Sequence, residues 1–131
     1  MKSLPVTYVK IDNYEEFPLG YLISTVTQLK GEGTWTFKTW NPTPALVDKK
    51  SGTTRFYVGQ NYDPKYFDLI QDGWTHDHCE ICSKRIMDKE DYAETHGYEL
   101  DGNWICQECY DIFMAPDDIE KELHKYPKVV R

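Results

Sequence analysis

Two Cys-x-x-Cys pairs, Cys79/Cys82 and Cys106/Cys109, constrain this chain more than any other feature. Twenty-three residues separate the pairs, and the 131-residue sequence has no fifth cysteine. Two residues between cysteines let both thiolates face one point, and four sulfurs about 2.3 Å from the ion complete the tetrahedral coordination of zinc. The spacing therefore predicts one structural Zn²⁺ per chain, with all four cysteines as ligands and no coordination position open for catalysis.

Disulfides, a redox-active pair and an iron–sulfur cluster are the alternative interpretations of these cysteines. Met1 is followed by no apolar signal segment, so a reducing, cytoplasmic compartment is expected and disulfides are disfavoured. A thioredoxin-type pair would need a βαβ frame, which neither pair has around it. No apolar run approaches the roughly 20 residues of a membrane helix, so no membrane-spanning segment is expected. Which thiophilic metal binds is left open.

The residues between and after the pairs predict a hairpin followed by a short helix. Asp101-Gly102 stands within residues 96–105, among aromatic and aliphatic residues, and both turn positions tolerate positive φ. Residues 106–114 then place apolar side chains at helical spacing, and Pro116 ends this helix. The second cysteine pair therefore lies in the first turn of the helix, whose N-terminus favours thiolates.

This order of cysteine knuckle, hairpin and helix resembles a treble-clef zinc finger over residues 74–114. The resemblance implies a frame held together by the ion rather than any one activity. Residues 77–82 and 104–110 also resemble a motif of small bacterial proteins. So short a segment rarely buries enough apolar surface to fold alone, and removal of the ion is expected to unfold it. A small core beside the ion is expected from Ile81, Ile86, Leu100, Trp104, Ile105 and Phe113.

The sequence as a whole predicts an α+β fold, in which an N-terminal antiparallel β-sheet with a helix precedes the zinc module and a C-terminal helix. β-branched and aromatic residues predict strands over residues 5–11, 20–29, 34–40 and 53–59, of which the second and third form a hairpin. Asp63-Pro64 is typical of a helix start and predicts a helix over residues 63–73. Acidic residues at the N-terminal end of residues 116–126 predict a second helix there. The predicted domains are residues 1–73 and 74–131, packed separately or as one compact domain.

The excess acidic charge of the chain lies entirely in its second half. Residues 1–75 contain eight basic and eight acidic residues, whereas residues 76–131 contain seven basic and fourteen acidic residues, a net charge of −7. Zinc modules that bind nucleic acid neutralise phosphates with Lys and Arg, so a nucleic-acid partner is not expected. A negative face favours a basic protein partner instead. Candidate partner contacts are Asp88, Glu90, Asp91 and the aromatic residue Trp40, which the alternation of residues 34–40 places on the solvent face.

No catalytic constellation is found, so we expect a non-catalytic, zinc-stabilised protein-binding module or adaptor. By analogy with small acidic bacterial proteins that neutralise basic toxins, its concrete form is an immunity- or antitoxin-like inhibitor. The alternative is an HNH-like metal-dependent nuclease on a treble-clef frame, in which His96 would activate water. Such enzymes also carry an Asn or His on the following helix, where this chain offers only Asp111. His76 and His78 are expected to be exposed loop residues, the alternative being ligation of a metal.

Overall fold

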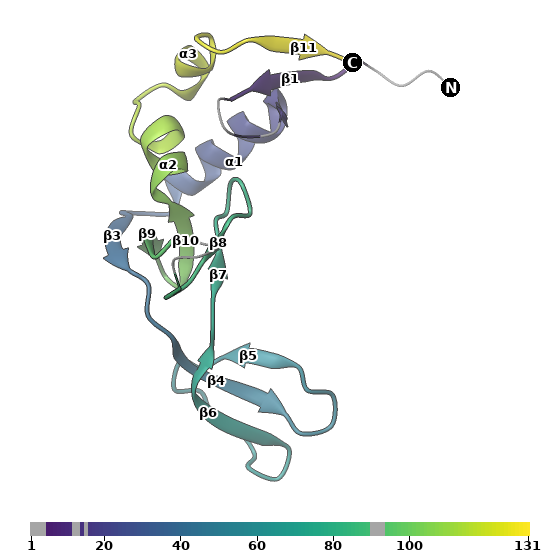
Figure 1. Ribbon diagram of the computed structural model, residues 1–131, viewed down its shortest axis with the longest axis vertical. Helices are drawn as coiled ribbons and strands as arrows, with labels where there is room; N and C mark the ends of the chain where they lie inside the picture. The colour runs from purple at the N-terminus through teal and green to yellow at the C-terminus, as the bar shows by residue number, and fades with distance from the viewer. Residues whose placement is uncertain (1–4, 12–13, 15, 90–93) are drawn as a thin grey trace. The chain divides into compact units, whose positions relative to one another are not determined.

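The computed structural model describes residues 5–11, 14, 16–89 and 94–131, and these residues have the predicted α+β architecture (Figure 1). The chain divides into two compact units, Met1–Thr36 together with Gln107–Arg131, and Phe37–Cys106. The predicted domains, residues 1–73 and 74–131, stay a prediction, because this division does not test which segments fold independently. No described helix combines the length and the apolar character that crossing a bilayer requires.

The first unit combines an antiparallel sheet with helical segments. The sheet has the strand order β11-β1-β2, and Tyr8 in its central strand lies opposite Val129 and Pro18. Helix α1 packs against η1 and α3. The strand and helix predicted over residues 5–11 and 116–126 are confirmed as β1 and α3. The elements are β1 (Thr7–Lys10), β2 (Glu16–Pro18), α1 (Leu19–Gly31), α2 (Gln107–Cys109), the single π-helical turn η1 (Tyr110–Met114), α3 (Ile119–Leu123) and β11 (Lys128–Val130).

The strand predicted over residues 20–29 is wrong, because this segment forms helix α1. Leu22, Val26 and Leu29 are its buried residues, at the i, i+4, i+7 spacing of one helix face. The β-branched residues around them lower helix propensity only weakly, so burial of this face decides the structure. The hairpin predicted with residues 34–40 is therefore also wrong, and β3 (Thr36–Thr39) belongs to a sheet with β9 and β10 instead.

The second unit contains three small sheets, with strand orders β10-β9-β3, β5-β4-β6 and β7-β8. In the sheet β5-β4-β6, the fully buried Ala45 lies opposite Phe56 on one side and Ile70 on the other. The strands predicted over residues 34–40 and 53–59 are confirmed as β3 and β5. The remaining elements are β4 (Thr43–Asp48), β5 (Thr54–Phe56), β6 (Phe67–Trp74), β7 (Asp77–His78), β8 (Arg85–Ile86), β9 (His96–Leu100) and β10 (Asn103–Cys106).

The helix predicted over residues 63–73 is wrong, because the chain makes one turn at Asp63 and then enters strand β6. The Asp63 carboxylate accepts a hydrogen bond from the N–H of Lys65 at 2.9 Å. Its carbonyl oxygen accepts from the N–H groups of Tyr66 and Phe67 at 2.9 and 3.0 Å. From Phe67 onward β4 provides an antiparallel partner. The Asp-Pro signal is therefore satisfied by a local turn and does not propagate into a helix.

The hairpin predicted around Asp101-Gly102 is confirmed as β9 and β10. Asp101 and Gly102 have φ angles of 51° and 85°, which suit a tight two-residue connection. Further along the hairpin, Gly97 lies opposite Cys106. A Cβ on Gly97 would lie 2.6 Å from the carbonyl oxygen of Ile105, so β9 and β10 approach this closely only because Gly97 has no side chain. The position of Cys106 therefore depends on Gly97.

Replacing Gly97 with alanine should lower the free energy of unfolding by about 1–3 kcal/mol, because the new methyl group would force the strands apart. Gly20→Ala is the matched control, since a Cβ at this position of α1 meets no atom within 4 Å. That substitution should be neutral or stabilising by up to about 1 kcal/mol. Urea unfolding of both variants measures the difference, and equal stabilities would contradict this account of the hairpin.

Candidate metal centre

The four cysteine sulfurs gather at one point of the structure, as their spacing predicts. The Sγ atoms of Cys79, Cys82, Cys106 and Cys109 all lie within 4.8 Å of one another. The sulfurs of Cys82 and Cys106 are 3.8 Å apart, too far for a disulfide, and none of the four cysteines is disulfide-bonded. Four sulfurs at about 2.3 Å from a tetrahedral zinc ion stand about 3.8 Å from one another. The cluster can therefore hold one metal ion such as zinc.

The first cysteine pair lies in the turn between β7 and β8. The N–H of Cys79 donates to the carbonyl oxygen of Lys84 at 2.8 Å, and its own carbonyl accepts from the N–H of Ser83 at 2.9 Å. Ser83 closes the turn with a φ of 65°. The N–H of Ile81 points at the sulfur of Cys79 at 3.4 Å, a contact that favours the thiolate form. Backbone hydrogen bonds therefore shape the first half of the site.

Backbone pairing with β10 brings the second cysteine pair to the first. Cys79 forms a short parallel bridge with Trp104, and the N–H of Glu80 donates to the carbonyl oxygen of Trp104 at 2.9 Å. Cys106 ends β10 two residues later, and Cys109 ends α2 one helical turn further on. Of the predicted core beside the ion, Leu100 is half-buried. The other members, Ile81, Ile86, Trp104, Ile105 and Phe113, are buried as expected.

Three of the four sulfur ligands are shielded from solvent. Cys79, Cys106 and Cys109 are at most 2 % exposed, whereas Cys82 is partly exposed. The hydroxyl oxygen of Tyr14 lies 3.9 Å from the sulfur of Cys109. Because several thiolates cannot be buried together without a compensating positive charge, this donor set calls for a cation. Soft, buried sulfur donors suit a thiophilic ion such as zinc.

The histidines do not join a metal-binding group in the described part of the chain, where the cysteines form the one cluster of three or more candidate ligands. His78 is exposed as expected but lies in strand β7 rather than in a loop, and its Nδ1 donates to the carbonyl oxygen of Ser83 at 3.1 Å. His76, also expected to be exposed, is half-buried. The His76 ring lies against that of His78 with centroids 5.0 Å apart, and partial burial lowers the pKa of His76. His96 packs its ring against Phe37, at a centroid distance of 5.3 Å.

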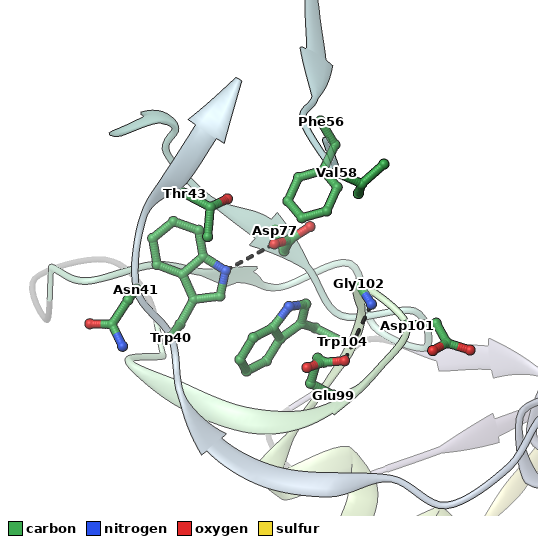
Figure 2. Close-up of a pocket in the computed structure, with 10 residues that line it drawn as sticks. All are labelled: Trp40, Asn41, Thr43, Phe56, Val58, Asp77, Glu99, Asp101, Gly102 and Trp104. Carbon is green, nitrogen blue, oxygen red and sulfur yellow. Dashed lines mark hydrogen bonds between the residues drawn. The ribbon is translucent and has the colours of Figure 1, made fainter. Parts of the chain in front are cut away.

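Trp40, predicted to lie on the solvent face, is buried with only 2 % exposure, so that prediction is wrong. Strand β3 ends at Thr39, and the alternation does not continue to Trp40. The indole N–H of Trp40 donates to Oδ2 of Asp77 at 2.9 Å (Figure 2). The indole N–H of Trp74 donates to the same oxygen at 3.1 Å. Burial raises the pKa of Asp77, and the two indole hydrogen bonds oppose this shift. These bonds anchor the chain two residues before Cys79.

The acidic residues proposed as partner contacts are placed only in part. Asp88 is exposed after β8, whereas Glu90 and Asp91 lie outside the described residues. Asp111, the nuclease alternative's only candidate on the helix, is exposed in η1. Sequence reasoning misses Asp77, because one of its tryptophan partners, Trp40, lies 37 residues away, and the nearby Trp74 alone does not mark this carboxylate.

Comparisons of the chain with protein-family models, with curated proteins and with solved structures each find no match. The geometry of the cysteine cluster therefore carries the assignment of a metal centre by itself.

The purified protein should bind one Zn²⁺ or Co²⁺ per chain, and Co²⁺ should show intense thiolate-to-metal charge-transfer absorption because all four ligands are sulfur. Removal of the ion should unfold at least residues 74–114, since binding free energy here is folding free energy. Near-ultraviolet circular dichroism and tryptophan emission would report the loss. Cys82→Ser should weaken metal binding, while His78→Ala should keep one ion per chain. Unchanged spectra after complete removal of the metal would contradict a structural role.

Replacing Asp77 with leucine should lower the free energy of unfolding of the zinc-loaded protein by about 2–4 kcal/mol, because two indole N–H donors lose their acceptor. Asp77→Asn is the matched control, since an amide of the same shape still accepts a hydrogen bond, and it should cost less. Denaturant unfolding at saturating Zn²⁺ measures both variants. If the two substitutions cost the same, the indole hydrogen bonds do not anchor this segment.

Proposed function

We propose that the protein is a non-catalytic, zinc-stabilised module of the treble-clef type that binds another protein. The order of its parts supports the frame: the cysteine turn between β7 and β8, the hairpin β9-β10, and α2 carrying Cys109. Zinc is the proposed ion because four thiolates in a closed set suit its tetrahedral preference. With every coordination position filled by sulfur, such an ion holds the fold and offers no position to a substrate.

The proposed binding surface is the face of the sheet β5-β4-β6 that carries the exposed apolar side chains of Phe56 and Ile70. Figure 1 shows the three strands of this sheet. Phe56 and Ile70 flank Ala45 across the three strands and are 37 % and 46 % exposed. Val58, just after β5, is 73 % exposed. Exposed apolar side chains that gather on one face mark interaction surfaces, whereas single scattered ones do not. This group is the observation that carries the proposal.

The proposed partner presents a basic surface. The whole excess of acidic residues falls within residues 76–131, and an ion held by four thiolates adds negative charge there. Such a charge distribution steers a positively charged protein toward the module. Inhibition of a basic toxin, as by an immunity protein or antitoxin, is the concrete form of this proposal and rests on analogy. No observation favours the nuclease alternative, so we propose no second function.

The test compares Ile70→Ser with Val130→Ser, which are matched because both remove an exposed β-branched side chain from a strand. A protein retained from cell extract by the wild-type chain is purified, and its Kd for each variant is measured. Ile70→Ser should weaken binding about tenfold or more, and Val130→Ser should change it little. Equal Kd values for the two variants would contradict the sheet face as the binding surface.

Added salt should weaken the wild-type complex, because screening reduces attraction between an acidic module and a basic partner. The Kd measured at low and at physiological ionic strength checks this expectation. An affinity that does not depend on salt would contradict a basic partner while leaving the sheet face in place.

A further inference from the structure

A pocket of about 440 Å³ lies beside the exposed sheet face, within the second unit (Figure 2). Phe56 at the end of β5 lines it, and the Cε1 atom of its ring is 3.7 Å from the point where a Cβ on Gly102 would lie. Trp40, Trp104 and Val58 provide the rest of its apolar lining. Three aromatic side chains from separate segments of the chain therefore meet at this pocket.

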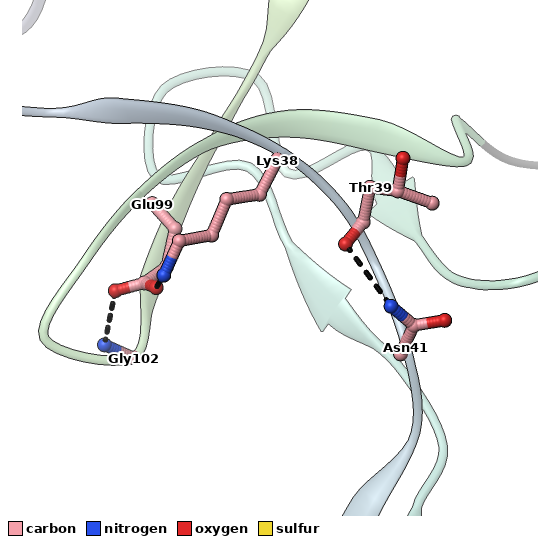
Figure 3. Close-up of polar contacts among 5 residues, drawn as sticks. All are labelled: Lys38, Thr39, Asn41, Glu99 and Gly102. Carbon is pink, nitrogen blue, oxygen red and sulfur yellow. Dashed lines mark hydrogen bonds and ion pairs between the residues drawn. The ribbon is translucent and has the colours of Figure 1, made fainter.

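The lining also carries three carboxylates, and none of the ten lining residues is Lys, Arg or His. Two of these carboxylates are held in place, Asp77 by the indole hydrogen bonds described above and Glu99 by its own partners. Glu99 accepts from Nζ of Lys38 at 2.6 Å and from the N–H of Gly102 at 3.3 Å (Figure 3). Because Lys38 offsets the charge of Glu99, Asp77 and the exposed Asp101 give the pocket its negative character.

The hydroxyl of Thr43 is a second and independent indication of a polar ligand. This oxygen belongs to a lining residue, is buried, and has no hydrogen-bond partner among the described residues. Buried polar atoms in native structures are nearly always hydrogen-bonded, so an unsatisfied one beside a pocket points to a missing partner. A threonine hydroxyl can accept a hydrogen bond from an N–H group.

We infer that this pocket binds the guanidinium group of an arginine side chain presented by the protein partner, an inference that rests on the proposed function. A guanidinium is planar, stacks on aromatic rings and donates several hydrogen bonds in fixed directions. Its donors match Asp77, Asp101 and the Thr43 hydroxyl, while its aliphatic stem suits Phe56 and Val58. A phosphate-bearing ligand would instead meet carboxylates, and charge repulsion disfavours it.

The experiment titrates N-acetylarginine amide into the zinc-loaded, full-length protein and follows the tryptophan indole N–H signals by NMR. N-acetylcitrulline amide is the matched control ligand, because it has the same shape but no charge. The arginine compound should shift the signals of Trp40 and Trp104 saturably, while Trp35, which is not a lining residue, should stay unchanged. The citrulline compound should bind at least tenfold more weakly.

Three variants locate the binding within the pocket. Asp101→Asn preserves the turn, since asparagine also tolerates positive φ, and should raise the Kd of the arginine compound about two- to fivefold. Thr43→Val keeps the shape of the side chain and should weaken binding without lowering the stability of the protein. Asp111→Asn removes the same charge from η1, outside the lining, and should leave the Kd unchanged.

Equal binding of the citrulline compound, no saturable shift, or equal effects of Asp101→Asn and Asp111→Asn would overturn the inference. Those results leave the proposed protein partner intact, because the Ile70→Ser comparison tests it separately. Agmatine, a small guanidinium compound, and a tripeptide with a central arginine then separate the two sources of the group. Binding of agmatine without binding of the tripeptide would overturn the assignment to a partner's side chain.

Discussion

Four sulfur atoms must meet within the coordination sphere of one ion, and the backbone around them is shaped by that requirement. The positive φ of Ser83 closes the first turn, and the missing side chain of Gly97 lets β9 approach β10 beside Cys106. The helical turn of α2 then places Cys109. Because acceptable metal–ligand distances vary by only about 0.2 Å, each of these backbone features contributes to the affinity for metal.

The partial burial of Asp77 explains why two tryptophans donate hydrogen bonds to its carboxylate. Asp77 is half-buried two residues before Cys79, and burial disfavours its charged form. The indole N–H groups of Trp40 and Trp74 compensate by donating to the same carboxylate oxygen. The hydrogen bond from the Trp40 indole to Asp77 therefore favours the buried position of Trp40. It outweighs the strand alternation, which would place Trp40 in solvent. The burial of Trp40 and the fixed orientation of Asp77 therefore both depend on this hydrogen bond.

Local patterns in the sequence predict those parts of the structure that local interactions decide. The Asp101-Gly102 turn depends on the φ angles that these two residues tolerate. The acidic start of the helix predicted over residues 116–126 depends on one nearby hydrogen bond, which the Asp118 carboxylate accepts from the N–H of Lys121 at 3.1 Å. Residues 20–29 and 63–73 are predicted wrongly because a distant surface settles each case, the core that buries one face of α1 and the strand β4 that pairs with β6. The roles of the pocket carboxylates Asp77 and Glu99 could not be predicted, since each also accepts a hydrogen bond from a residue tens of positions away, Trp40 and Lys38.

Two residues that line the pocket also lie next to the cysteine turn in the backbone, so in the proposed module a bound ion would steady the pocket without touching its ligand. Trp104 pairs with Cys79 through its backbone and lines the pocket with its side chain. Asp77 lines the pocket too and leads directly into the cysteine turn. Carboxylates already fixed by the protein lose little conformational freedom when a cation binds, which favours affinity. In the proposed module, a zinc ion held by the four thiolates would contribute to recognition by fixing the backbone that carries Asp77 and Trp104, and no further chemistry of the metal is needed.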